Sequence, residues 1–103
     1  MRYIMKIRMP VDKGNEETSN PQFGQKMNEL LTEIKAEAAY FTTINGQRGA
    51  YIIVNMNDAS EIPAIAEPFF IWLNADIDFQ PVMKPEDLAK AGPAIGAAVK
   101  KWG

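Results

Sequence analysis

Within residues 67–82, the spacing of apolar side chains changes from that of a helix to that of a strand. An apolar stripe with helical spacing begins at Ile62 and ends at Leu73. From residue 75 to residue 81, apolar and polar residues alternate, which is the pattern of a strand with one buried face. This junction places a helix directly before a strand, so we expect a fold that mixes the two.

The remaining segments are assigned from the same two periods and from residues that favour turns. We expect, in chain order, a strand over residues 2–9, a mobile polar loop over residues 11–20, a helix over residues 20–38, strands over residues 40–45 and 50–56 joined by a hairpin turn, and a helical tail from residue 85 that breaks at residues 92–93. Asn20 and Asp58 are suited to capping the two long helices, and Glu61 extends the second cap into a capping box.

The order of these elements predicts the fold class. Strand, helix, strand, strand, helix, strand is the ferredoxin-like βαββαβ arrangement of an α+β protein, here with an extra C-terminal helix. Right-handed crossovers place the first and third strands in the centre and both helices on one face. We therefore expect a single domain, with residues 1–83 as the ferredoxin-like part and residues 84–103 as its helical tail.

Composition excludes several classes of function. Lys and Arg number 11 and Asp and Glu 13, so the net charge of −2 does not favour nucleic acid or an anionic membrane as a partner. The chain has no cysteine and no histidine, which removes thiolate chemistry and the commonest general base. The N-terminal strand carries charges within its apolar run, so it resembles neither a signal peptide nor a membrane span. We expect a cytoplasmic protein without a cofactor.

Two acids in the last strand are predicted to face two bases in the first. In the ferredoxin-like order these strands are neighbours, with Asp76 and Asp78 on the same side as Lys6 and Arg8. Opposite charges across strands contribute about 0.2–1 kcal/mol per pair. This ionic ladder is a better interpretation than a Mg²⁺ or Ca²⁺ site, because two carboxylates without a third ligand make a weak metal motif.

The sheet face away from the helices is predicted to be partly apolar. Ile4 and Val82 lie on it, together with alternate residues of the hydrophobic strand over residues 50–56. Such a face usually has a partner, and two copies related by a two-fold axis would close a barrel. We therefore expect a homodimer or a higher oligomer of this chain.

Three segments carry a resemblance to a known superfamily. They are IMKIRMPV (residues 4–11), GQRGAYIIVNMND (residues 46–58) and EPFFIWLNADIDFQPV (residues 67–82). With them, residues 1–83 resemble the dimeric α+β barrel superfamily, and within it the muconolactone isomerase-like proteins and related small uncharacterised domains. The isomerases carry histidines along the first strand and near the fourth, and this chain has none, so no catalytic residue is carried across.

The resemblance implies a small hydrophobic or aromatic ligand in a cavity between sheet and helices. Seven residues are candidates to bind it: Tyr3, Met5, Tyr40, Arg48, Phe69, Phe70 and Trp72. Arg48 would bind an anionic group; for most of the others, an ordinary core is the simpler alternative. If the protein is an enzyme, Glu67 and Asp76 beside the aromatic run are the candidate acids or bases, with solvent exposure and ion pairing as their alternatives. A non-catalytic oligomeric interaction module and a cofactor-free isomerase- or monooxygenase-like enzyme stay open as further hypotheses.

Overall fold

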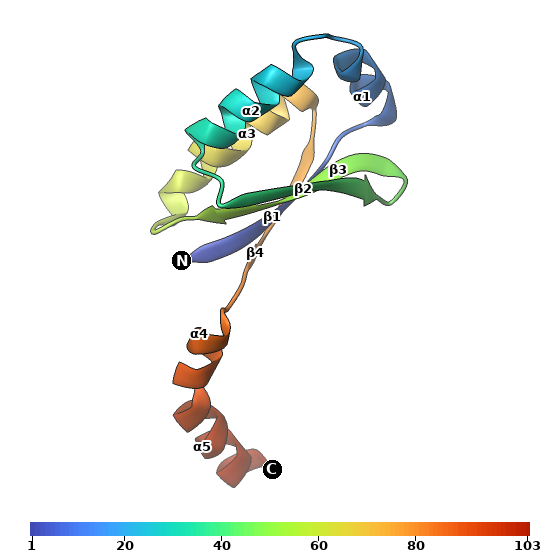
Figure 1. Ribbon diagram of the computed structural model, residues 1–103. Coiled ribbons are helices and arrows are strands. Elements are labelled where there is room, and N and C mark those ends of the chain that lie inside the picture. The colour runs from blue at the N-terminus through green and yellow to red at the C-terminus, as the bar shows by residue number, and fades with distance from the viewer.

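The computed structural model describes residues 1–103 and contains one four-stranded antiparallel sheet (Figure 1). Its strands are β1 (Arg2–Arg8), β2 (Ala38–Ile44), β3 (Gln47–Asn55) and β4 (Asp76–Pro81). They are ordered β2-β3-β1-β4, and every neighbouring pair is antiparallel. This is the predicted ferredoxin-like order, with β1 and β3 in the centre.

The helices occupy two places relative to the sheet. They are α1 (Val11–Thr18), α2 (Phe23–Glu33), the short 3₁₀ helix η1 (Ala59–Glu61), α3 (Ile62–Leu73), α4 (Pro85–Lys90) and α5 (Gly92–Trp102). Figure 1 shows α2 and α3 together over one face of the sheet, whereas α4 and α5 lead away from the end of β4 on the opposite side. We call residues 1–83 the body and residues 84–103 the tail. The projecting tail stretches the molecule to 58 × 28 × 21 Å.

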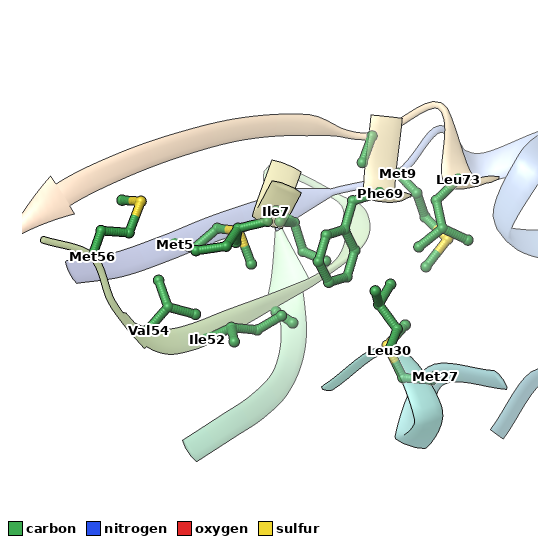
Figure 2. Close-up of a cluster of buried hydrophobic side chains, with 13 residues drawn as sticks. Met5, Ile7, Met9, Met27, Leu30, Ile52, Val54, Met56, Phe69 and Leu73 are labelled. Carbon is green, nitrogen blue, oxygen red and sulfur yellow. The ribbon is translucent and has the colours of Figure 1, made fainter. Parts of the chain in front are cut away.

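The core lies between the sheet and the two covering helices (Figure 2). Alternate residues of β1 and β3 face this layer, and Met5, Ile52 and Val54 have no solvent exposure. Phe69 and Leu73 of α3 close the core from the helix side, also with no exposure. Burial of each such side chain contributes about 1.5–3 kcal/mol. The period-two pattern of the strands and the stripe of α3 are therefore confirmed.

The turn between β2 and β3 is the predicted hairpin. It contains two residues, Asn45 and Gly46, with φ angles of 50° and 79°. Two successive positive φ angles favour an Asn-Gly pair and match the twist of the strands they join. The turn thereby sets the register of β2 on β3, including the pair of Tyr40 with Tyr51.

The predicted capping box is present at the start of η1, the short helix that leads directly into α3. The Oδ1 atom of Asp58 accepts a hydrogen bond from the Ser60 N–H at 2.9 Å. In return, Oε2 of Glu61 accepts hydrogen bonds from the N–H groups of Asn57 and Asp58, at 2.6 and 2.8 Å. The hydrogen bonds from Ser60, with the backbone bond the largest contribution, hold the pKa of Asp58 below its ordinary value.

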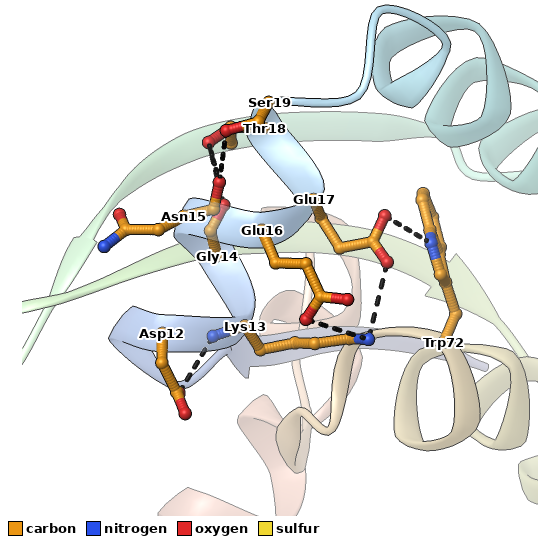
Figure 3. A network of polar contacts seen from close by, with 9 residues as sticks. All are labelled: Asp12, Lys13, Gly14, Asn15, Glu16, Glu17, Thr18, Ser19 and Trp72. Atoms are coloured by element: carbon orange, nitrogen blue, oxygen red, sulfur yellow. Dashed lines mark hydrogen bonds and ion pairs between the residues drawn. The ribbon is translucent and has the colours of Figure 1, made fainter.

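The expected loop over residues 11–20 is wrong, because most of it forms α1. Lys13 forms ion pairs with Glu16 at 3.8 Å and with Glu17 at 3.5 Å, one helical turn away. Glu17 in turn accepts a hydrogen bond from the indole N–H of Trp72 at 3.2 Å (Figure 3). A polar helix without an apolar stripe is thus held by its own side-chain pairs and by contacts to α3 and β3, the latter including a hydrogen bond from Arg48 to Asn15.

The tail consists of two short helical pieces, as predicted. Helix α4 ends at Lys90 and α5 begins at Gly92, so the break falls at Ala91, directly before the predicted glycine and proline. No residue of α4 or α5 is buried. None of the helices in the protein combines the length and apolar character needed to cross a membrane.

Candidate functional site

The sheet face opposite the core, which we call the open face, has no covering layer. Its apolar part is formed by residues that pair across three strands: Ile4, Ala38, Tyr40, Tyr51 and Ile53. Tyr40 is 64% exposed and Tyr51 is 39% exposed. A contiguous apolar patch with two uncovered aromatic rings on one sheet is unusual for a protein that has no partner.

A small polar hollow adjoins this patch on the same face. Lys6 lies opposite Asp78 and Arg8 lies opposite Asp76, which confirms the predicted register of the ionic ladder. Arg8 Nε is 3.0 Å from Asp76 Oδ2, whereas no ion pair joins Lys6 to Asp78. The resulting hollow, which we call the ionic hollow, measures about 100 Å³. Its lining residues are Lys6, Arg8, Ile44, Asn45, Asp76 and Asp78.

One ion pair stands at the edge of the open face. Nε and Nη2 of Arg2 each lie 2.7 Å from a carboxylate oxygen of Glu37, so the pair is bidentate. The hydrogen bond from Arg2 holds the pKa of Glu37 below its ordinary value. The planar guanidinium of Arg2 matches the carboxylate, which positions the segment before β2 against the first residue of β1.

A second hollow lies on the other side of the molecule, between α2 and α3; we call it the helix groove. It measures about 430 Å³. The apolar part of its lining consists of Leu30, Pro68, Ile71 and Trp72. Three glutamates and one lysine border it: Lys26, Glu29, Glu33 and Glu67. The groove therefore combines apolar lining residues with more negative than positive charge.

The Trp72 side chain of the groove is held by contacts to three residues. Its indole N–H donates to Glu17 of α1, as Figure 3 shows. The amine of Lys26 lies 4.7 Å from the ring centroid, and the ring of Phe23 packs at 5.4 Å with a tilt of 43°. The contact to Glu17 was missed in the sequence, although the four-residue spacing of Lys13 and Glu17 is a helical signal that could have revealed α1.

The candidate ligand-binding residues divide among separate parts of the molecule. Met5 and Phe69 are completely buried in the core, and Tyr3 packs edge-on against Phe79 at 6.4 Å on the core side of the sheet. Tyr40 lies on the open face, while Phe70 (41% exposed) and Trp72 belong to α3. Arg48 donates a hydrogen bond from Nη1 to Asn15 Oδ1 of α1 at 3.0 Å. The structure therefore does not gather these side chains around one cavity.

The two candidate catalytic residues are not neighbours either. Glu67 is an exposed residue of α3 at the rim of the helix groove. Asp76 lies on the open face, with a side chain 73% exposed and paired with Arg8. The sheet and its core separate these two carboxylates, so they do not form one acid–base pair. No group of three or more carboxylates that could hold a metal ion occurs in the chain.

Comparison with known families gives one match. Residues 1–96 match a family described as "Domain of unknown function (DUF3303)". The matched range covers the whole body, α4 and the first turn of α5, so the family pattern extends into the tail. A search of curated proteins finds no match to the chain.

Proposed function

The chain belongs to the DUF3303 family, and we propose that it is a homodimeric binding module for a small molecule. Two copies would pair through their open faces and form an α+β barrel. The molecule would be apolar or aromatic, with a polar group, and would lie between the two sheets. The observation that carries this proposal is the uncovered patch of Tyr40 and Tyr51 beside the ionic hollow.

The open face supports pairing because its apolar residues gain burial only from a second chain. A two-fold axis brings the same patch of both copies together, so one self-complementary surface is sufficient. Packed sheets lie about 10 Å apart, which leaves room for interdigitating side chains and a small ligand. Ile4 and Ile53, paired in register, would form the centre of this contact.

The position of the ligand follows from where free space and free polar groups coincide. The layer between sheet and helices is filled by side chains such as Met5 and Phe69, which have no exposure. On the open face, Lys6 lies opposite Tyr51 in register and has no ion-pair partner, so a ring on Tyr51 could place its polar group at Lys6. The open face is therefore better supported than the expected cavity between sheet and helices.

From the resemblance to muconolactone isomerase-like proteins, we take only the mode of pairing between two copies and no catalytic activity. Pairing through the sheet is independent of the histidines of the isomerases, which this chain lacks. A cofactor-free reaction would use carboxylates, and Glu67→Gln and Asp76→Asn test that reading. Loss of turnover of a recovered ligand, with folding retained, would indicate an enzyme rather than a binding module.

Native mass spectrometry of freshly purified protein tests the proposal. The expected result is a dimer mass with an additional bound small molecule. Ile53→Lys should convert the dimer to a monomer and release that molecule, because it places a charge in the centre of the contact. Thr43→Lys is the matched control, since Thr43 is exposed on the other side of the edge strand β2. A dimer with bound ligand that survives Ile53→Lys would contradict the proposal.

A non-catalytic interaction module is the second candidate, and the tail favours it. Two helices without a single buried residue extend from the body. A dimer mass without any bound molecule would support this second candidate over small-molecule binding.

A further inference from the structure

The tail helix α5 carries an apolar stripe that its own chain leaves uncovered. Ile95, Val99 and Trp102 are spaced by four and three residues, so they lie along one face of the helix. They are 49%, 64% and 78% exposed. An isolated helix of this length is only marginally stable in water, and burial of its apolar face would stabilise it.

Two lysines accompany this stripe. Lys100 and Lys101 lie in the last turn of α5, where positive charge favours the helix dipole. Neither forms an ion pair within the chain. The amine of Lys101 lies 5.1 Å from the centroid of the Trp102 ring, so cation and aromatic ring are presented together. The surface that would recognise this helix is apolar in its centre and acidic at its border.

The helix groove has this character. Its lining includes Ile71, which is 76% exposed, and the ring of Trp72, which is hydrogen-bonded to Glu17. Glu33 and Glu67 stand at its border, and neither forms an ion pair within the chain. A groove between two helices that receives the apolar face of a third is a recurrent mode of recognition.

We propose that α5 of one copy docks in the helix groove of a second copy. Val99 and Trp102 would cover Ile71 and Trp72, and the lysines of α5 would face the glutamates of the rim. The tail leaves its own body on the side of the sheet opposite α2 and α3, which directs it to another copy rather than to its own groove (Figure 1). Reciprocal exchange of two tails closes the assembly with a two-fold axis. The proposal goes beyond pairing of the open faces and is independent of it.

Disulfide cross-linking tests the contact directly, because the chain has no cysteine of its own. A tagged Val99→Cys copy is mixed with an untagged Ile71→Cys copy under mild oxidation. Both positions are exposed, so neither substitution disturbs the core. The expected product is the mixed disulfide, which the tag separates by mass from pairs of like copies.

A second mixture distinguishes the alternative docking place. Val99→Cys with Tyr40→Cys reports α5 on the open face of another copy. A greater yield from this mixture than from the first would overturn the proposal, and so would the absence of a mixed disulfide in both. If Ile53→Lys abolishes pairing of the open faces and the first mixture still cross-links, the tail contact stands while the sheet contact fails.

Charge reversal tests whether the lysines of α5 and the glutamates of the helix groove attract one another, and reversal on both sides serves as the control. Glu33→Lys with Glu67→Lys in the groove copy should lower the cross-linking yield roughly tenfold at low salt. Lys100→Glu with Lys101→Glu in the tail copy should have the same effect. Combining both reversals should restore the yield, which a structural defect in either variant would not allow. Two reversals without effect would contradict the assigned orientation of α5.

Discussion

Helices α3 and α5 have similar lengths and both carry apolar stripes, yet one is buried and the other is exposed. α3 has 12 residues and buries Ile65, Ala66, Phe69 and Leu73 against the sheet. α5 has 11 residues and buries none. The stripe of α3 is used within its own chain, and that of α5 is available to another. The pair shows that an apolar stripe indicates a need for cover but does not indicate which molecule supplies it.

The same contrast applies to the regions that contain these helices. The body is held by contacts between segments that are distant in the chain, such as β1 with β3 and with β4. The tail relies on local bonds, for example the Lys84 N–H donating to Asp87 Oδ2 at 2.9 Å. We therefore expect substitutions in the core of the body to alter the free energy of unfolding and substitutions in the tail to alter association.

Phe69→Ala should produce the largest decrease in the free energy of unfolding. Phe69 has no solvent exposure and closes the core from α3, so truncation leaves a cavity and should cost about 3–5 kcal/mol. Urea denaturation measures the change, at a concentration low enough to keep the chain monomeric. Ile71→Ala on the exposed side of the same helix is the control, with an expected change within about 0.5 kcal/mol. Equal losses from both variants would contradict the boundary drawn between core and surface.

Gly49→Ala should have the next largest effect and lower the free energy of unfolding by about 1–3 kcal/mol. A Cβ atom at this position would lie 2.6 Å from the carbonyl oxygen of Ile7 and 2.7 Å from Cδ1 of Ile44. Because one of these neighbours is backbone of the central strand β1, the sheet must shift to accept it. Gly24→Ala in α2 is the control, since nothing lies within 4 Å and alanine is the better helix former. The melting temperatures of both variants measure the effect. An unchanged melting temperature of Gly49→Ala would show that strands β1 and β3 leave room for a Cβ atom at this position.

Acidification should weaken the body by a smaller amount. Hydrogen bonds from Ser60 lower the pKa of Asp58, and the hydrogen bond from Arg2 lowers that of Glu37. A carboxyl with a lower pKa in the folded state stabilises fully above its unfolded pKa, and this stability is lost as pH falls through the folded value. Asp58→Asn keeps a capping oxygen without the charge, so its melting temperature should depend less on pH below about pH 5. An unchanged pH profile would contradict the role assigned to the charge of Asp58.

Removal of residues 84–103 should have the smallest effect on the body itself. No residue of α4 or α5 is buried, so the melting temperature of the dilute, monomeric chain should stay nearly constant. Association should weaken instead, which analytical ultracentrifugation over a range of concentrations measures. A large loss of stability at low concentration would show that the tail folds onto its own body.

Much of the fold could be predicted because it depends on local periodicity. The stripe of α3, the alternation of β4 and the Asn45-Gly46 turn can each be recognised within a short segment of the sequence. Once these elements are ordered, few topologies remain, so the facing of Arg8 and Asp76 also followed. Helix α1 was missed because it lacks an apolar stripe and depends in part on the bond between Glu17 and Trp72, which are 55 residues apart.

The positions of the candidate site residues could not be predicted from local sequence patterns alone. An aromatic run such as residues 69–72 places its members on all sides of a helix, so Phe69 fills the core, Phe70 is half exposed and Trp72 borders a groove. The sequence by itself determined the four strands, the two covering helices, their order and the strands that became neighbours, because these follow from backbone geometry and chain connectivity. Only the tertiary structure decided which apolar surfaces are covered and which stay open. Coverage depends on the meeting of distant segments, and the open face and the tail are the surfaces that no segment of this chain reaches.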